Sequence, residues 1–222
     1  HRDLHSFPTR RSSDLVSPIS ASISMNLTKL FILFFAVLLL GAGDIQSGKE
    51  KSQTCIACHG EDGNSVVGLW PSLAGQNPKY LLKQLQLIQS EERYIAEMNG
   101  QLDGYSDQDL QDITAYYSNN KNKIGQASAD LVDKGFKLYY AGSLEKGIPA
   151  CTACHSPKGT GNSSAGYPLL SGQKAEYIAK TLKDYRTGNR QDSEQSAIMV
   201  SIAYKLDDKE IEALASFING LY

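Results

Sequence analysis

Apolar residues recur every three or four positions through much of the chain, which is the spacing of one face of an α-helix. The clearest apolar stripes run through residues 80–88, 110–117, 130–140, 177–185 and 211–218. Ser106 with Asp109, and Asp207 with Glu210, have the spacing of the capping box that starts a helix. Polar and apolar residues do not alternate convincingly in any segment, as they would in a strand. The pattern predicts an all-α protein.

The helical pattern occurs twice along the chain. WPSLAGQNPKYLLKQL (70–85) matches YPLLSGQKAEYIAKTL (167–182), 97 positions later, and MNGQLDGYSDQDLQDITAYY matches MVSIAYKLDDKEIEALASFI, 101 positions later. Such a repeat indicates two duplicated domains. We expect three to five helices in each, with an N-terminal domain at residues 44–120, a polar linker at 121–129 and a C-terminal domain at 130–222.

The beginning of the chain has a different character. Met25 and the basic Lys29 precede an apolar run of eleven residues and the small residues Gly-Ala-Gly. This order predicts a secretory signal peptide at residues 25–43. The run is shorter than the ~20 residues that span a bilayer, although a retained anchor is the alternative. Residues 1–24 lie before this methionine and have no apolar periodicity, so we interpret them as a non-native upstream segment.

Charge limits the class of partner. Residues 44–222 contain 18 Lys and Arg against 22 Asp and Glu, a net charge of −4. They contain no run of basic residues, so nucleic acid is not an expected partner. A mildly acidic surface is compatible with an exported protein.

The cysteines and histidines are the most specific signal. After residue 43 every one of them belongs to a Cys-x-x-Cys-His motif, and the six residues are Cys55, Cys58, His59, Cys151, Cys154 and His155. This motif attaches c-type haem. The two thiols bond to the vinyl groups of the porphyrin, and the histidine gives the iron an imidazole nitrogen. The sequence therefore predicts two covalently bound c-type haems.

Three other interpretations of these residues have to be weighed. Disulfides are common in exported proteins, and Cys-x-x-Cys also forms thioredoxin-like redox sites. Neither needs a histidine immediately after the second cysteine, in both copies. Structural zinc needs a fourth ligand, and no further cysteine or histidine follows residue 43. Haem attachment is the interpretation that uses all six residues.

The methionines are candidates for the second axial position of each iron. Met98 and Met199 are the only methionines after residue 43, and they occupy equivalent positions in the repeat. Both lie in sequence that reads as a loop, some eight residues before a capped helix. Packing in the core is the common role of methionine. A thioether ligand would raise the reduction potential, and two strong axial ligands would leave no open position on the iron.

Other residues near the motifs can tune such a site. Pro71 and Pro168 follow His59 and His155 by twelve and thirteen residues, so a backbone carbonyl there can accept the histidine Nδ1–H. The alternative is that each proline simply ends a loop. Trp70 and Tyr167 directly precede these prolines, and we expect them to pack on the haem rather than to relay electrons. Arg93, Arg186 and Arg190 can neutralise haem propionates, although a solvated helix face is the commoner position of an arginine.

These motifs together resemble the dihaem cytochromes c of the cytochrome c4 family, over about residues 43–222. The resemblance rests on CIACHGEDGN, WPSLAGQNPKYLLKQL and Met98, and on CTACHSPKGTGN, YPLLSGQKAEYIAKTL, DYRTGNR and Met199. It implies a bacterial periplasmic electron carrier with two His/Met haems. Family members link respiratory donors to terminal oxidases, often in association with a membrane. The first copy departs from the family pattern, because LIQSEERYIAEM is four residues shorter than DYRTGNRQDSEQSAIM.

Two further functions remain in competition with a free electron carrier. The chain can be the dihaem electron-accepting subunit of an enzyme complex, such as a flavocytochrome c sulfide dehydrogenase. A dihaem peroxidase would need an open axial position on one haem, which the paired Met98 and Met199 oppose. We therefore expect no catalysis by the chain itself, and redox proteins as its partners.

Overall fold

The computed structural model describes residues 43–222. Residues 1–24 lie outside this part, as does the predicted signal peptide except for its last residue, Gly43. The described helices are all too short or too polar to cross a bilayer. The described residues form helices and loops, with two isolated antiparallel bridges, Ser143 to Ile148 and Asn162 to Tyr167. The all-α prediction is confirmed.

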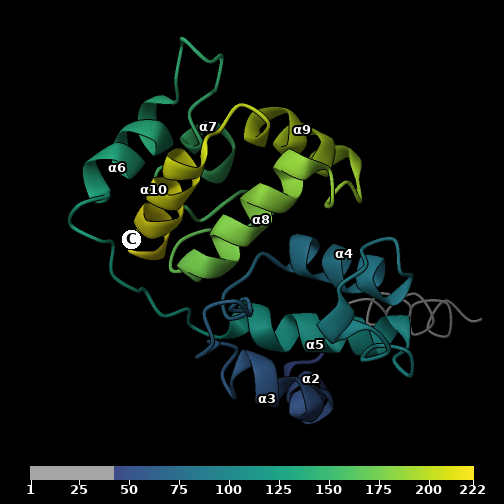
Figure 1. Cartoon of the computed structure of the whole chain (residues 1–222). Helices are drawn as coiled ribbons and strands as arrows, with labels where there is room; N and C mark the ends of the chain where they lie inside the picture. Colours follow the sequence, from purple (N-terminus) through teal and green to yellow (C-terminus); the bar gives the residue numbers. More distant parts are fainter. Residues whose placement is uncertain (1–42) are drawn as a thin grey trace, which may run out of the picture. The chain divides into compact units, whose positions relative to one another are not determined.

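The helices fall into two successive groups (Figure 1). The first half contains α2 (Ile45–Lys51), η1 (Ser52–Cys55), α3 (Ile56–His59), α4 (Pro78–Gln89), η2 (Ala96–Met98) and α5 (Asp107–Asn119). The second half contains α6 (Val132–Ala141), α7 (Thr152–His155), α8 (Ala175–Thr187), α9 (Glu194–Ala203) and α10 (Asp208–Asn219). Within the described residues, each half thus has a number of α-helices in the expected range.

The helix starts follow the expected capping chemistry. The Ser106 side chain accepts a hydrogen bond from the Asp109 amide, and Asp109 accepts one from the Ser106 amide, so α5 begins with a capping box. Asp207 and Glu210 form the same box on α10. Each box satisfies two amides that have no partner inside the helix.

Helix α9 was not expected from the sequence. Its apolar residues lie on all sides rather than in a stripe, so it lacks the periodic signal by which the other long helices are recognised. Its start is nevertheless set by local contacts. Ser193 is the N-cap residue, and its side chain forms a capping box with that of Ser196, three residues later. The segment before Met199 is therefore helical, and its interpretation as a loop was wrong.

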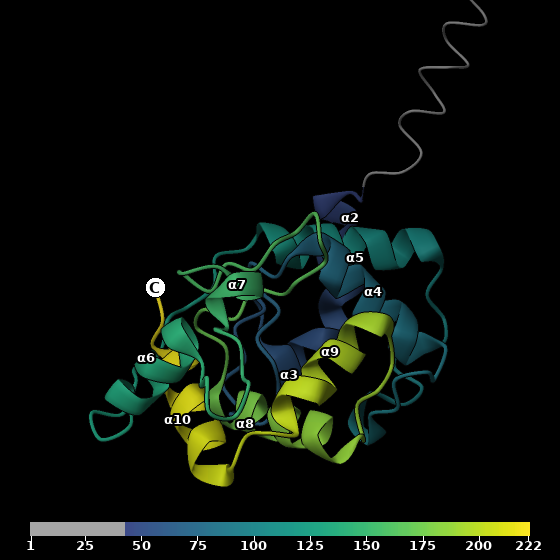
Figure 2. The ribbon, with the colours of Figure 1, turned by 90° about the horizontal axis from the view of Figure 1, so that it is seen from above.

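In each half the first and last long helices cross at a glycine. Helix α2 crosses α5, and α6 crosses α10; Figure 2 shows both pairs side by side. A Cβ atom on Gly48 would overlap the carbonyl of Asp112, and one on Gly135 would overlap the carbonyl of Ala213. Only glycine allows the two backbones to approach so closely.

Each half has its own hydrophobic core. In the first half Leu110 and Tyr117 are fully buried, and Cys55 and Met98 pack against the same cluster. In the second half the buried side chains come mainly from α6, α8 and α10, and Cys151 and Met199 pack against them. The two clusters share no residue, as a duplicated architecture requires.

The two halves contact each other through a reciprocal pair of glutamines. The Gln76 side chain donates to the carbonyl of Leu169 (3.0 Å) and accepts from the Leu169 amide (2.8 Å). Gln173 makes the same two bonds to Ser72, at 2.9 and 2.8 Å. Gln76 and Gln173 are 97 positions apart, as are Ser72 and Leu169, so the repeat produces a contact with approximate twofold symmetry.

Candidate cofactor-binding site

The two Cys-x-x-Cys-His motifs lie on two short helices. Cys58 and His59 belong to α3, and Cys55 immediately precedes it; the second motif is placed in the same way around α7. No disulfide joins any two of the four cysteines, which disfavours the disulfide interpretation. Burial raises the pKa of Cys55 and raises that of Cys151 to about 11, so these two thiols are protonated at neutral pH.

Each motif histidine is oriented by a proline carbonyl. His59 Nδ1 lies 2.9 Å from the Pro71 oxygen, and His155 Nδ1 lies 3.2 Å from the Pro168 oxygen. The expected hydrogen bonds to these two prolines are confirmed. Because Nδ1–H donates to the carbonyl, the lone pair of Nε2 remains free to bind a metal ion.

Burial reinforces the neutral form of both imidazoles. His59 and His155 are 8% and 7% exposed. Burial lowers the pKa of each ring, and the proline carbonyl opposes this only in part, so the net shift is downward in both. A neutral imidazole with a fixed ring is the form that ligates iron.

The two methionines are held by different local structures. Met98 ends the short 3-10 helix η2, whereas Met199 lies in the middle of α9. Each packs against the hydrophobic core of its own half. The repeat thus preserves the position of the thioether relative to the core but changes the backbone that carries it.

The candidate attachment and ligand residues all line one continuous cavity of about 710 Å³. Its wall includes the four cysteines, both motif histidines and both methionines, and it also includes Trp70 and Tyr167. The remaining lining is largely apolar. Free thiols, imidazoles with an available Nε2 and thioether sulfurs therefore face the same apolar space, and this donor set fits c-type haem.

The arrangement of the side chains does not support a zinc site. Among residues 43–222, no three side chains of His, Cys, Asp or Glu come together as a group that can hold a metal ion. The motif residues are thus arranged for a ligand that supplies its own bonds to the metal, as a porphyrin does.

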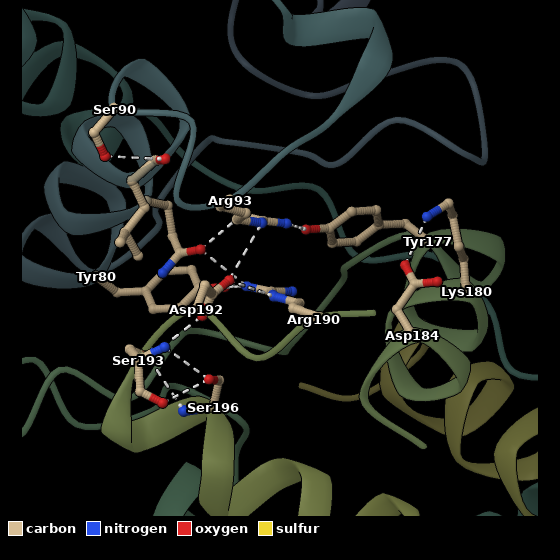
Figure 3. A network of polar contacts seen from close by, with 12 residues as sticks. Tyr80, Ser90, Arg93, Tyr177, Lys180, Asp184, Arg190, Asp192, Ser193 and Ser196 are labelled. Atoms are coloured by element: carbon tan, nitrogen blue, oxygen red, sulfur yellow. Dashed lines mark hydrogen bonds and ion pairs between the residues drawn. The ribbon is translucent and has the colours of Figure 1, made fainter. Parts of the chain in front are cut away.

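A buried polar cluster lies where the two halves meet and also lines this cavity (Figure 3). We call it the junction cluster, and its members are Tyr80, Gln84, Arg93, Tyr177, Arg190 and Asp192. Arg93 donates to Gln84 at 2.6 Å and to Tyr177 at 3.3 Å. Arg190 donates to Tyr80 at 2.8 Å and to Gln84 at 3.0 Å. Each arginine therefore reaches a tyrosine of the other half.

The three arginines singled out in the sequence separate into two groups. Arg93 and Arg190 line the cavity, so neither lies on a solvated helix face. Arg186 does not line it; its guanidinium donates to the Leu206 carbonyl and to Asp208. Arg186 ties α8 to the start of α10, so the propionate-binding alternative is not supported for this arginine.

Known proteins match this arrangement closely. The Cytochrome c family model matches residues 45–121 and 132–221. A cytochrome c4 from Azotobacter vinelandii is 47% identical over 204 residues, which cover 88% of this chain and 97% of the relative. The chain belongs to the cytochrome c4 family. The crystal structure of reduced recombinant cytochrome c4 from Pseudomonas stutzeri superposes with a TM-score of 0.80 at 49% identity, and covers 82% of this chain and 100% of that one.

A more distant relative points to a second context. The protein named thiosulfate dehydrogenase electron acceptor from Thiomonas intermedia (strain K12) is 33% identical over 177 residues, which cover 76% of this chain and 78% of the relative. Together with the two motifs, membership of the cytochrome c4 family means that the chain holds two c-type haems and transfers electrons.

Sequence reasoning missed several residues of this cytochrome c4 site. Gln76 with Gln173, and Tyr80 with Tyr177, are identical in the two copies of the repeat. That identity was available as a signal. Gln84 and Asp192 differ from their counterparts in the repeat, Thr181 and Ile95, so no repeat signal marks them.

Proposed function

We propose that the chain is a periplasmic carrier of single electrons in a bacterial respiratory chain, delivering them toward a terminal oxidase. In this proposal Cys55 with Cys58, and Cys151 with Cys154, attach the two haems. The proposal also makes His59 and Met98 the axial ligands of the first iron, and His155 and Met199 those of the second. The observation that carries it is the cavity into which each half brings an oriented imidazole and a thioether.

The protein residues determine what such a site can do. The carbonyls of Pro71 and Pro168 fix each imidazole ring and increase the basicity of its Nε2. These residues would let a bound haem exchange one electron at a time, and the soft thioether would favour the reduced form and so raise the potential. With a histidine and a methionine bound, each iron would have no position left for a substrate or an oxidant. Electron transfer without bond-making is therefore the activity that this donor set supports.

Arg93 and Arg190 fit the charged edge of the cofactor. Arg190 is buried and Arg93 is largely so, both line the cavity, and the Arg190 Nε has no hydrogen-bond partner among the described residues. Guanidinium groups pair well with carboxylates, so we propose that these two arginines neutralise haem propionates. Trp70 and Tyr167 cover the apolar part of the cofactor.

We propose the following organisation of the whole chain. Residues 25–43 form an export signal, which directs the protein to the compartment where c-type haem is attached, and residues 1–24 are a non-native upstream segment. The two haem domains comprise residues 44–120 and 130–222, joined by the linker 121–129. Peripheral association with a membrane is compatible with this organisation.

A second candidate function is the electron-accepting subunit of an enzyme complex. It is favoured by the 33% identity to a protein named thiosulfate dehydrogenase electron acceptor. A flavocytochrome c sulfide dehydrogenase would be another complex of this kind. Purification from the native source distinguishes the two functions: a stoichiometric catalytic subunit that co-elutes supports the second, and a dihaem protein that elutes alone supports the first.

An optical redox titration of the haem-loaded protein tests the ligand assignment. We expect two reduction steps at positive potential and a thioether-to-iron absorption band in the oxidised state. Met98→Ala and Met199→Ala should each remove about half of that band and lower one potential by tenths of a volt, within the roughly 0.8 V that axial ligands span.

The matched controls are Ile88→Ala and Ile202→Ala, since both side chains line the cavity, pack against the same core as the methionine of their half, and carry no ligand atom. They should leave the band intact. A band that survives either methionine substitution would refute the assignment of that methionine.

A further inference from the structure

The junction cluster contains two arginines but one carboxylate. Asp192 Oδ2 lies 3.7 Å from Arg93 Nε and 3.5 Å from Arg190 Nε (Figure 3). Neither arginine forms an ion pair with any other carboxylate among residues 43–222. Because arginine stays protonated in proteins, the cluster carries one net positive charge.

This charge lies in a poorly hydrated place. The side chain of Asp192 is 4% exposed, and those of Arg93 and Arg190 are 11% and 6% exposed. The Arg190 guanidinium also lies 4.8 Å from the centre of the Tyr185 ring. With little water to screen it, a charge here acts over longer distances than one on the surface.

Asp192 breaks the symmetry of the cluster. Arg93 and Arg190 are equivalent in the repeat, as are Tyr80 and Tyr177, and each arginine reaches across to the other half. At the offset of 97 that pairs the two arginines, Asp192 corresponds to Ile95, which has no charge. A carboxylate supplied by the second half alone therefore pairs with an arginine from each half.

The carboxylate is also held in place by its own loop. Asp192 directly precedes Ser193, the capping residue of α9, whose hydroxyl donates to Asp192 Oδ1 at 3.4 Å. Helix α9 carries Met199. The segment that positions the second methionine thus also positions the carboxylate that both arginines share.

We propose that Asp192 is a positioning residue that clamps Arg93 to Arg190 and so lowers the reduction potentials of both haems together. The proposal rests on the dihaem electron-carrier function proposed above. A negative charge stabilises the oxidised, more positive state of a redox centre. Since Asp192 pairs with an arginine of each half, it should shift the potentials of both centres in the same direction.

The test is an optical redox titration of the full-length, haem-loaded Asp192→Asn protein beside the wild type. Asparagine keeps the shape of the side chain and removes its charge. We expect both reduction equilibrium constants to rise roughly tenfold, which is the scale for one unit charge acting over about 12 Å at an effective dielectric constant of about 20. For a one-electron step, tenfold corresponds to about 59 mV.

Three controls separate charge from structure. Glu194→Gln removes the same charge from an exposed side chain two positions away, and should leave both potentials unchanged. Asp192→Glu restores the charge, and should return both potentials toward the wild-type values. Should Asp192→Asn fail to incorporate two haems, Asp192→Ser removes the same charge and leaves room for water, and takes its place.

The possible outcomes decide the proposal. Haem-methyl resonances in paramagnetic NMR spectra assign each titration step to one half. A rise in both potentials that Asp192→Glu reverses supports the proposal. A rise in only one potential, no rise, or an equal rise in Glu194→Gln overturns it. Failure of the underlying function is distinguishable, because the wild type itself would then lack two steps with a thioether-to-iron band.

Discussion

The crossing of the first and last helices is built differently in the two halves. Where α2 meets α5, the contact is ionic: Lys51 Nζ lies 2.6 Å from Asp109 and 2.5 Å from Asp112, and Asp112 also accepts the Asp44 amide at 2.8 Å. Where α6 meets α10, the contact is aromatic, and the rings are Phe136, Tyr139, Tyr140 and Phe217.

The common feature of the two crossings is the glycine, Gly48 in one and Gly135 in the other. Close approach of the backbones admits only this residue, whereas the space around the crossing can be filled by ion pairs or by rings. The comparison shows that the backbone geometry of the crossing fixes the glycine but not the side chains around it. It also predicts that the two halves respond differently to loss of a side chain and to pH.

The largest expected effect is in the aromatic crossing. Phe217 is 8% exposed and its ring lies 5.5 Å from that of Tyr139 and 6.0 Å from that of Phe136. Phe217→Ala should lower the free energy of unfolding by about 3–5 kcal/mol, because it removes apolar contacts and leaves a cavity.

Amide hydrogen exchange of the haem-loaded protein locates that loss. Protection should fall mainly in α6 and α10, and much less in α2 and α5. Tyr222→Ala, at a ring that is 86% exposed, is the matched control and should change little. Equal loss of protection in both halves would show that the two crossings unfold as one unit, and would break the comparison.

A smaller effect is expected in the ionic crossing. Asp112 is 3% exposed, and its carboxylate accepts hydrogen bonds from Lys51, the Asp44 amide and Gln108. Asp112→Ala should cost about 1–3 kcal/mol, because these donors lose a buried acceptor. Lys51 keeps Asp109 as a partner, which limits the loss.

Exchange protection should here fall in α2 and α5 while α6 and α10 stay protected. Asp103→Ala, which removes an exposed carboxylate from the same half, serves as the control. If Asp112→Ala proved as costly as Phe217→Ala, the ionic crossing would be more rigid than its contacts suggest.

The ionic crossing should also respond to pH. Burial raises the pKa of Asp112, but Lys51, the Asp44 amide and Gln108 outweigh it, so the net shift is below the ordinary value of 3.8. The stability that this carboxylate contributes is therefore complete above about pH 3.8 and is lost as the pH falls through the lower folded pKa.

The opposite sign applies to Lys51. Its hydrogen bonds to Asp109 and Asp112 raise its pKa from 10.5 to about 12. Its contribution is complete below pH 10.5 and is lost as the pH rises through about 12. We expect exchange protection of α2 and α5 to decline at both extremes, and the acid decline to be weaker in Asp112→Ala. If protection in the Asp112→Ala variant declined in acid as it does in the wild type, other carboxylates would be responsible for the decline.

The sequence predicted those features that local rules determine. Apolar stripes located α4, α5, α8 and α10, and side chains three positions apart located the capping boxes of α5 and α10. The inventory of cysteines and histidines identified the cofactor, because haem attachment requires their order and spacing. The proline carbonyls near His59 and His155 were found through their distance along the chain.

What the sequence did not predict depends on contacts between distant segments. Helix α9 has apolar residues on all sides, so its pattern does not distinguish it from a loop. Arg186 and Arg190 are both arginines near the end of α8, and only the fold separates the one that pairs with Asp208 from the one that lines the cavity. Asp192 corresponds to the uncharged Ile95 at the 97-residue offset of the repeat, so no repeat signal marks it, and its role arises where the halves meet.

The smallest expected effect concerns the backbone that carries each methionine. The Ser193 side chain accepts from the Ser196 amide at 3.2 Å at the start of α9, whereas η2, which carries Met98, has no side-chain cap. Ser193→Ala should therefore cost about 1 kcal/mol, and this cost should fall on α9 alone.

The thioether-to-iron band reports this effect during thermal unfolding. In Ser193→Ala about half of the band should be lost at a lower temperature, while the half that belongs to Met98 keeps its wild-type transition. Ser201→Ala is the matched control, because that hydroxyl is exposed and bonds only to the Ile198 carbonyl of its own helix. If Ser193→Ala shifted both transitions equally, the cap of α9 would stabilise the junction of the halves rather than one methionine. The difference between the two methionine segments would then have no separate consequence for ligation.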